Sequence, residues 1–355
     1  MSVTAHERPG VYSSYDASSV TRRSQGSRVI GIAAKAAKGT VGEVVTVTGY
    51  ESGRAVFGED SEGGGMTGLL RLLYENGASE VKAVRVAESG TVSDYTAAFR
   101  ALAESDSVRI VVTDSALTEV HQALRSHVET ASENRRERIA IVGGSGETVS
   151  AMLTHAAALN SERMVLVGPD ALDEGGSRRS AVLGAAALAG RLAAERDPAL
   201  PVNGVSLRGL GGAAVSLTES EIDSLVRGGV TPLESLGGVL SPIRGITTRT
   251  KTGEVSDATW RELSTILIVD DVIPALRESL RSKFLRSKNT ARNRGAIRSQ
   301  VIVELERKVE AEIIEGYGEV AVRASGDDPT VCEVEFPFAV AHGLNQIYLT
   351  AHITV

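Results

Sequence analysis

Short apolar runs and amphipathic stretches alternate along residues 28–246. Residues 29–33 and 108–112 are apolar runs bounded by turn residues, a pattern typical of buried strands. Residues 118–129 carry apolar side chains three or four positions apart, which predicts a helix with one buried face. Strands and helices that alternate in this way predict a parallel sheet covered by helices on both faces.

The same two patterns predict most elements of this region. Strands are predicted over residues 29–33, 44–48, 80–87, 108–112, 138–142 and 164–167. Helices are predicted over residues 66–76, 95–103, 118–129, 149–159 and 179–194. The last helix is rich in alanine and glycine, so we expect its backbone to pack closely against a neighbour.

The last third of the chain has a different pattern. Residues 259–269 are apolar and lead into a helix predicted over 270–284. Residues 294–315 predict a long helix whose apolar stripe holds Ile302, Leu305, Val309 and Ile313. Residues 331–338 predict a strand, and Pro337 places that strand at a sheet edge or marks its end.

Both ends of the chain show extended patterns with no partner in view. At the C-terminal end Ile347, Leu349, Ala351, Ile353 and Val355 alternate with polar residues, which predicts a strand that needs a sheet to join. Residues 1–25 lack a helical period, and Val11 and Tyr12 indicate a short strand. Such an end is also typical of simple fraying.

Composition narrows the class of protein. Hydrophobic residues make up 42% and charged residues 23% of the 355 positions, as in soluble globular proteins. Aromatic residues are only 4%, which is low for a ring-lined pocket, and the net charge of −7 disfavours nucleic acid as the partner of the whole chain. The single cysteine, Cys332, excludes an internal disulfide and a cysteine-based metal site. No apolar run reaches the ~18 residues of a membrane span, and the first ten residues lack the apolar core of a secretory signal.

Three segments invite comparison with nucleotide-binding loops. Residues 63–68 are glycine-rich and lead into a helix, but they lack the lysine of a Walker motif. Residues 266–271 (ILIVDD) resemble a Walker B strand, and we interpret them as a strand that ends at a helix N-cap. Gly143 to Gly146 follow a strand and precede a helix, although neither the Gly-x-Ser-x-Gly nor the Gly-x-Gly-x-x-Gly pattern is complete.

None of the six histidines has metal-ligand spacing. We therefore predict no catalytic, cofactor-binding or metal-binding residues and no enzymatic activity. The alternative that stays open is an α/β nucleotide-binding enzyme that uses the loop from Gly143 to Gly146.

One segment is strongly basic in an otherwise acidic chain. Residues 277–298 hold eight basic residues against Glu278 alone, which favours an acidic partner over a solvated helix face. Nucleic acid is a weaker alternative because Phe284 is the one aromatic residue available for base stacking. The eight are Arg277, Arg281, Lys283, Arg286, Lys288, Arg292, Arg294 and Arg298.

The order of several short motifs resembles the contractile tail sheath family of bacteriophages, tailocins and related injection machines. The resemblance covers nearly the whole chain and rests on this collinear order more than on any one motif. The motifs lie at residues 7–12 (ERPGVY), 29–33, 38–39, 44–48, 57–58, 72–77, 84–86, 201–205 (PVNGV), 217–218, 229–233 (GVTPL), 244–248 (RGITT) and 266–355.

The resemblance implies an α/β and α+β multidomain fold. It implies a discontinuous core built from the N- and C-terminal parts, a middle α/β domain called subtilisin-like after its fold alone, and extended arms at both ends. The corresponding segments are an arm at 1–25, the N-terminal α/β part of the core at 26–93, the subtilisin-like domain at 94–246 and a C-terminal sheath domain at 247–355 that ends in a strand-donating arm.

The resemblance also implies a function. It predicts a structural subunit that polymerises helically around an inner tail tube, donates strands from its terminal arms, and contracts by rigid-body repacking to drive the tube through a cell envelope. The implied partners are further copies in stacked hexameric rings, the tube protein, and baseplate and tail terminator proteins, with no nucleic acid and no membrane insertion. The expected location is the tail of a virion or phage-like particle assembled in the bacterial cytoplasm, and the basic segment is expected to face the tube.

Overall fold

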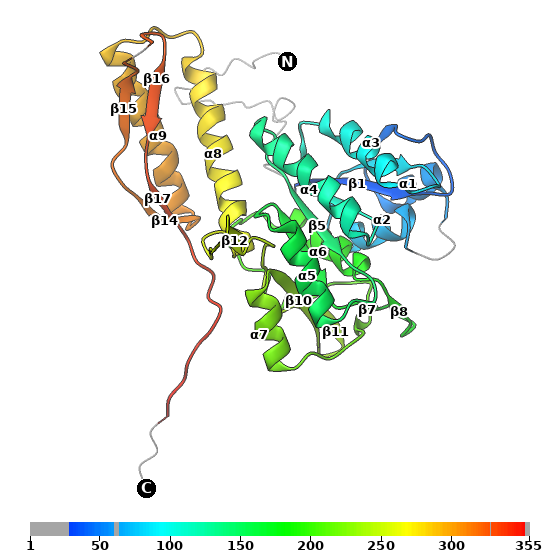
Figure 1. Ribbon diagram of the computed structural model, residues 1–355. Helices are drawn as coiled ribbons and strands as arrows, with labels where there is room; N and C mark the ends of the chain where they lie inside the picture. Colours follow the sequence, from blue (N-terminus) through cyan, green and yellow to red (C-terminus); the bar gives the residue numbers. More distant parts are fainter. Residues whose placement is uncertain (1–27, 60–63, 327, 352–355) are drawn as a thin grey trace, which may run out of the picture.

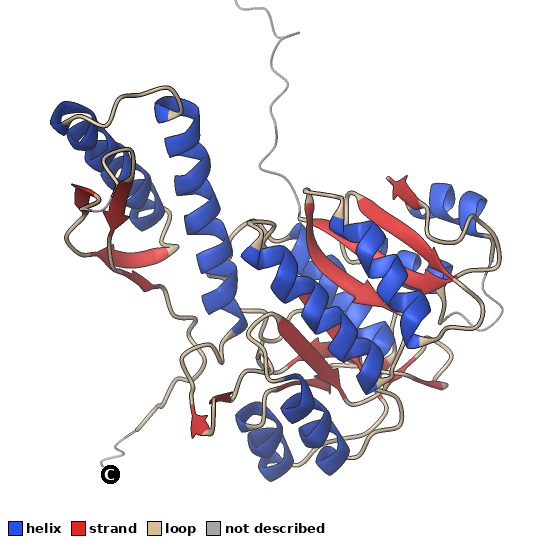
Figure 2. Cartoon of the chain, turned by 45° about the horizontal axis from the view of Figure 1, so that its top comes forward, coloured by secondary structure: helices blue, strands red, loops and turns tan. Residues whose placement is uncertain are grey.

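The chain folds into an α/β body and a helical hairpin that stands off it, followed by an extended segment. The structure is a computed structural model that describes residues 28–59, 64–326 and 328–351. The body holds the elements from β1 to β13, and the hairpin consists of α8 and α9 with a small β-ribbon packed on them (Figure 1). Figure 2 shows the same separation from a second direction, with α8 nearer the body and α9 farther from it.

The body is organised around one eight-stranded sheet of order β11-β10-β6-β5-β4-β1-β3-β2. Its six central strands run parallel, and an antiparallel strand closes each edge. The strands are β1 (Val29–Lys35), β2 (Val44–Val47), β3 (Val81–Val86), β4 (Val108–Thr113), β5 (Ile139–Gly143), β6 (Met164–Gly168), β10 (Val230–Leu236) and β11 (Val239–Pro242). Because β1 pairs with both β3 and β4, the sheet continues across the boundary predicted between residues 93 and 94.

Helices cover both faces of this sheet, as predicted. One apolar core holds residues of α1 (Tyr50–Phe57), α2 (Met66–Glu75) and α6 (Val182–Ala194). The other face packs against α3 (Val92–Ala103), α4 (Thr118–Glu133), α5 (Val149–Leu159) and α7 (Glu219–Arg227). A Cβ on Gly190 would lie 2.5 Å from the carbonyl oxygen of Leu73, so α6 and α2 approach as closely as the glycine-rich sequence predicted.

Helix α8 (Leu263–Phe284) begins seven positions before its predicted start, and the strand predicted at residues 266–271 is wrong. The physical reason is that α8 is buried on two sides. Leu263, Ile266 and Leu267 belong to a core of the body, whereas Ile268 and Val272 belong to the core of the hairpin. A helix with two apolar faces has a continuous apolar sequence, which also resembles a buried strand.

The remaining C-terminal elements are shorter than predicted. Helix α9 (Ala291–Glu310) ends before Glu312, whose φ of 56° reverses the chain into β14 (Ile314–Tyr317). The single strand predicted over 331–338 is two strands, β16 (Cys332–Glu335) and β17 (Phe338–Val340), since Pro337 interrupts the pairing. β14 pairs with β17, and β15 (Ala321–Ala324) pairs with β16.

Five very short strands complete the description. β7 (Ala171–Leu172), β8 (Arg178–Arg179) and β9 (Gly212–Ala213) form a three-stranded sheet, and β12 (Lys251–Thr252) pairs with β13 (Val255–Ser256). The predicted elements of the body agree with the structure to within a few residues, whereas α1, α7, β10, β11 and the five very short strands were not predicted from the sequence.

Candidate assembly surfaces

The base of α8 is fixed to the body by a buried ion pair. Arg163, at the start of β6, donates two hydrogen bonds of 2.9 and 3.0 Å to the carboxylate of Asp270, and each side chain is 13% exposed. Burial raises the pKa of Asp270, although Arg163 acts in the opposite direction. The neighbouring Asp271 accepts a hydrogen bond from Lys308 and so joins α8 to α9. The two aspartates that resembled a Walker B motif therefore hold elements together.

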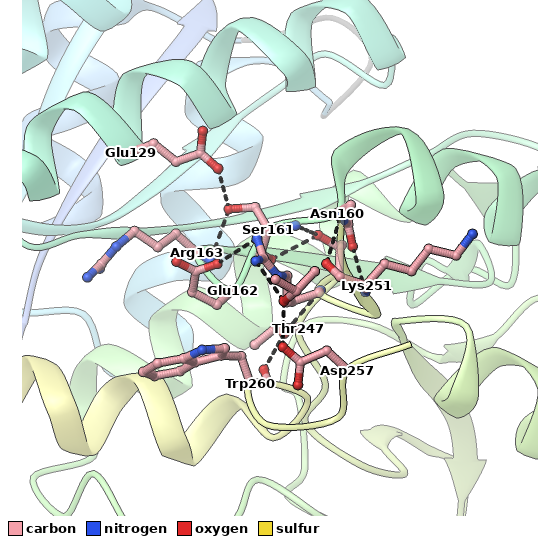
Figure 3. Close-up of polar contacts among 12 residues, drawn as sticks. Glu129, Asn160, Ser161, Glu162, Arg163, Thr247, Lys251, Asp257 and Trp260 are labelled. Atoms are coloured by element: carbon pink, nitrogen blue, oxygen red, sulfur yellow. Dashed lines mark hydrogen bonds and ion pairs between the residues drawn. The ribbon is translucent and has the colours of Figure 1, made fainter. Parts of the chain in front are cut away.

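A polar network holds the connection that leads into α8 (Figure 3). The side-chain oxygen of Asn160 accepts hydrogen bonds from the backbone of Thr250 and Lys251, and the hydroxyl of Thr247 donates to the carbonyl oxygen of Trp260 at 2.6 Å. Ser161 donates to Glu129 at 2.7 Å and thereby adds α4 to the network. Helix α8 consequently starts from a base tied to several elements of the body.

The structure divides the eight basic residues into two groups. Arg277 and Arg281 face a groove between α8 and the body. Lys283, Arg286, Lys288, Arg292, Arg294 and Arg298 lie around the turn between α8 and α9, which we call the basic tip (Figure 1). Three of the six donate hydrogen bonds: Lys283 to the side chain of Gln300, Arg294 to the side chain of Asn289 and Arg298 to the carbonyl oxygen of Val320. The side chains of Arg286, Lys288 and Arg292 are exposed and have no hydrogen-bond or ion-pair partner among the described residues.

The groove has a volume of about 880 Å³ and a mixed lining. Its apolar wall consists of Pro274, Leu280, Phe284 and Leu285, and its charged residues are Arg109, Arg135, Glu137, Arg277, Glu278 and Arg281. Arg277 donates a 2.8 Å hydrogen bond to one carboxylate oxygen of Glu137. Burial acts to raise the pKa of Glu137, but Arg277, a backbone hydrogen bond and the charge of Arg109 together leave the pKa below its usual range.

Two of these residues are in unusual situations. Arg135 follows the C-terminus of α4 with a φ of 63°, a left-handed conformation that usually belongs to glycine or asparagine and costs other residues about 1 kcal/mol. Glu137 is only 7% exposed, and its second carboxylate oxygen, Oε2, has no hydrogen-bond partner among the described residues. Sequence analysis missed both residues, because neither belongs to a motif and the partner of Glu137 lies 140 positions away.

The loop from Gly143 to Gly146 is occupied by side chains of the chain itself. The amide of Gly146 donates to the carboxylate of Asp170 at 2.9 Å, and Arg178 donates to the same carboxylate at 2.8 Å. A Cβ on Gly143 would lie 2.3 Å from the backbone of Ala181, so this position packs against α6. A carboxylate where a nucleotide would place its phosphate disfavours phosphate binding.

Two histidines next to this loop form a buried pair. The rings of His121 and His155 are stacked with centroids 4.9 Å apart, and a hydrogen bond of 2.9 Å joins Nδ1 of His121 to Nε2 of His155. Glu147 contacts the other nitrogen of His155 at 2.8 Å, and burial together with His155 lowers the pKa of His121 to about 3. Both rings are almost fully buried, and the described residues contain no cluster suited to a metal ion.

The C-terminal segment leaves the ribbon in an extended conformation. From residue 341 to 351 it forms no strand, and Ile347, Tyr348 and Leu349 are 79 to 91% exposed. Its start lies against the body, where Asn203 donates a 2.7 Å hydrogen bond to Asn345. It stays a prediction that this segment pairs with a strand of another subunit. The same prediction for Val11 and Tyr12 falls outside the described part of the chain, and so do Ile353 and Val355.

The ribbon offers a complementary feature. Within the described residues β14 pairs only with β17 and β15 only with β16, so each strand has an unpaired edge. Gly318 donates to the carbonyl oxygen of Pro337 at 2.9 Å, which joins the two pairs into one bent two-stranded ribbon. Unpaired edges are surfaces to which a further strand can add.

Two family models match successive parts of this chain. The phage tail sheath protein central domain matches residues 89–248, and the phage tail sheath C-terminal domain matches residues 255–354. The chain belongs to the phage tail sheath family. Its place is accordingly the contractile tail of a phage or a phage-like particle, and the resemblance noted in the sequence is confirmed.

Relatives and solved structures agree with this membership. The chain is 30% identical to the tail sheath protein of Bacillus phage SP01 over 253 residues, which cover 69% of this chain and 43% of that protein. It is 26% identical to the tail sheath protein of Mycobacterium phage Bxz1 over 304 residues, which cover 79% of this chain and 50% of that protein. The tail sheath chain therefore spans about half the length of these curated relatives.

Two solved structures have the same fold at low identity. A chain of the anti-feeding prophage baseplate, 6-fold symmetrised, superposes with a TM-score of 0.75 at 14% identity, over 99% of this chain and 100% of that chain. A chain of the anti-feeding prophage helical sheath in the contracted state gives a TM-score of 0.70 at 15% identity, over 98% and 99%. The predicted α/β and α+β multidomain fold class is confirmed. None of the described helices has the length and hydropathy that crossing a bilayer requires.

Proposed function

We propose that this chain is the structural subunit of a contractile tail sheath and polymerises helically around an inner tail tube. The observation that carries the proposal is the order of the central and C-terminal sheath domains along the chain, followed by an extended, exposed segment. A strand that alternates apolar and polar residues is suited to add to an unpaired edge of the ribbon in a neighbouring copy. A contact of this kind repeats from copy to copy and builds a filament instead of a closed dimer.

Contraction is proposed to occur by rigid-body repacking of subunits. The ion pair between Arg163 and Asp270 and the network in Figure 3 support this, because they tie the base of α8 to the body. Residues 26–246 would then move as one unit with the C-terminal domain of 247–355, while the arms keep neighbours linked. Stacked hexameric rings and contacts with the baseplate and the tail terminator complete the proposal, supported by the symmetrised baseplate and helical sheath structures of the anti-feeding prophage.

The basic tip is proposed to face the tube. Three of its cations, Arg286, Lys288 and Arg292, have side chains that are exposed and without a partner among the described residues, and they lie at the end of the hairpin farthest from the sheet. An acidic tube surface is the expected complement, because exposed ion pairs hold two surfaces together without a large apolar area that contraction would have to separate.

Electron microscopy of the purified protein tests the proposal. A sheath subunit forms tubes or stacked rings, alone or after addition of its tube protein. A small monodisperse oligomer that forms no polymer under either condition would contradict the proposed function. A nucleotide-binding enzyme is not favoured, since Asp170 occupies the loop that it would need.

A further inference from the structure

We infer that the groove between α8 and the body binds the acidic corner of a second copy of this chain. By acidic corner we mean Glu306, Glu310, Glu312 and Glu315, at the end of α9 and the start of β14. The inference rests on the proposed function, because it assigns one of the contacts through which sheath subunits associate.

The groove has charged groups without partners. Arg135 and Arg281 are exposed, and no ion pair of the described residues involves either of them. Arg135 also keeps a left-handed backbone that a glycine would adopt more readily, so a guanidinium is placed here at some cost in backbone energy. Glu137 Oε2 is buried and lacks a hydrogen-bond donor. The groove thus presents two free cations and one free acceptor beside an apolar wall.

The acidic corner has the complementary property. All four of its glutamates are exposed, and the ion pairs among the described residues include none of them. Glu306 accepts a hydrogen bond from the hydroxyl of Tyr317, so Glu310, Glu312 and Glu315 are the carboxylates left without a partner among the described residues. The two cations nearest in sequence are already used, because Arg307 pairs with Glu304 and Lys308 with Asp271. Ile313, half-buried within the corner, adds apolar surface for the wall of the groove. Carboxylates of the corner suit the free guanidiniums, and a backbone N–H group of the corner suits the Oε2 atom of Glu137.

A single copy cannot bring the two surfaces together. The bond between Lys308 and Asp271 places the corner beside the start of α8, whereas the groove extends along α8 from Pro274 to Leu285. Figures 1 and 2 both show α9 on the side of α8 that is turned away from the body, and the groove lies on the body side. The contact is therefore between different surfaces of two copies, and repeating it extends a chain of subunits.

A charge-swap experiment tests the inference. The groove variant carries Arg135→Glu and Arg281→Glu, and the corner variant carries Glu310→Arg and Glu315→Arg. Each variant alone should raise the protein concentration needed for assembly about tenfold or more, because like charges then face each other across the contact. A chain with all four substitutions should assemble at a concentration close to the wild-type value. A matched control, Arg100→Glu with Arg196→Glu at two other exposed arginines, should behave like the wild type.

Rescue by the fourfold variant identifies the occupant as this same chain. If the groove variant fails to assemble and the fourfold variant fails equally, the groove holds another partner, such as the tube protein or residues 1–27, and the inference is wrong. If every variant assembles like the wild type, the groove makes no contact and the inference is also wrong. Circular dichroism and thermal unfolding of each variant separate loss of assembly from loss of folding.

A cross-link distinguishes failure of this inference from failure of the proposed function. In a Cys332→Ser background, Arg281→Cys and Glu312→Cys should form disulfide-linked multimers on oxidation, because the two positions meet only between copies. Multimers without sheaths would support the contact and contradict the sheath function. If sheaths form but neither disulfide-linked multimers nor rescue by the fourfold variant is observed, the sheath function is supported and the proposed contact is wrong.

Discussion

Arg163 and Asp270 lie 107 positions apart and form the two-hydrogen-bond ion pair that joins β6 of the body to the first turns of α8. In the proposed rigid-body contraction, force applied to the hairpin of one subunit reaches the body of the same subunit through this junction. The junction should therefore contribute both to the stability of the subunit and to the orientation of α8.

Loss of one partner of this pair should be costly. Arg163→Ala leaves Asp270 buried without its cation, and we expect the free energy of unfolding to fall by about 3 kcal/mol. Chemical denaturation of the purified subunit measures the change. Arg227→Ala is the matched control, since Arg227 pairs with Asp223 on the surface of α7 and should lose no more than about 0.5 kcal/mol. Equal effects of the two variants would contradict a structural role for the buried pair.

Two histidines with lowered pKa values, the buried His121 and the partly buried His127, should make the subunit sensitive to acid. Burial and His155 lower the pKa of His121 to about 3, and burial and Arg138 lower the pKa of His127 to about 4, from 6.5 in both cases. The unfolded chain therefore binds more protons than the folded chain below pH 6.5. The stability that the neutral rings provide is present above that pH and is lost as the pH falls toward 4 and then 3.

His127→Gln tests this pH dependence. Glutamine keeps an acceptor for Arg138, which contacts His127 Nε2 at 3.2 Å, but it does not titrate. Between pH 6.5 and 4 the free energy of unfolding of the variant should depend less on pH, by up to about 1.4 kcal/mol per unit. Denaturation series at four or five pH values measure the slope. A variant that follows the wild-type profile would show that His127 is not neutral in the folded chain.

The extended segment should be needed for assembly but not for folding. Deletion of residues 347–355 removes side chains such as Ile347 and Leu349, which are 79 and 91% exposed and add little to any core of the subunit. The truncated chain should unfold at the same temperature as the full chain yet form no long polymers. Thermal unfolding and electron microscopy of the same samples decide the matter, and long sheaths from truncated protein would contradict strand donation.

Most helices and strands of the body were predicted correctly because each can be recognised from the pattern of apolar and polar residues within its own segment. Strands such as β4 and β5 are apolar runs between turns, and α5 is predicted to the residue. Helix α1 was missed because Gly53 interrupts its pattern. That glycine is required by packing, since a Cβ there would lie 2.7 Å from a methyl group of Leu70. Helix α7 does carry a local signal in the sequence, the capping box formed by Thr218 and Glu221 at its N-terminus.

The candidate surfaces were harder to predict because they depend on distant pairs. The basic character of residues 277–298 was visible in the sequence as a charge run. The separation of these residues into a groove-lining pair and a basic tip was not visible there. Only the fold shows that Arg277 is paired with Glu137, 140 positions away, and that Arg281 faces a groove while Lys288 lies at the tip. The early start of α8 was hidden for a similar reason, since burial on two sides removes the polar face that marks a surface helix.

The basic tip should bind the tail tube through exposed charges. Replacement of Lys283, Arg286, Lys288 and Arg292 by serine removes four cations from the end of the hairpin without touching its apolar core. Each exposed pair is worth only about 0.2–1 kcal/mol, but the contributions add over many subunits, so co-sedimentation with purified tubes should weaken clearly. Raised salt should weaken the binding of the wild type and change that of the variant less.

A matched control and a competing ligand make this test specific. Arg100→Ser with Arg196→Ser and Arg227→Ser removes exposed charge from the body and should leave tube binding unchanged. Nucleic acid is the alternative partner of a basic surface, so binding to duplex DNA is measured in parallel at low and moderate salt. DNA affinity falls steeply as salt is raised, and the fall grows with the number of phosphates contacted. If the basic tip faces the tube, the tip variant should lose binding to tubes and the body variant should bind them as the wild type does. If both variants bind tubes as the wild type does, or if the tip binds DNA and not tubes, the tip faces a different partner in the assembled tail.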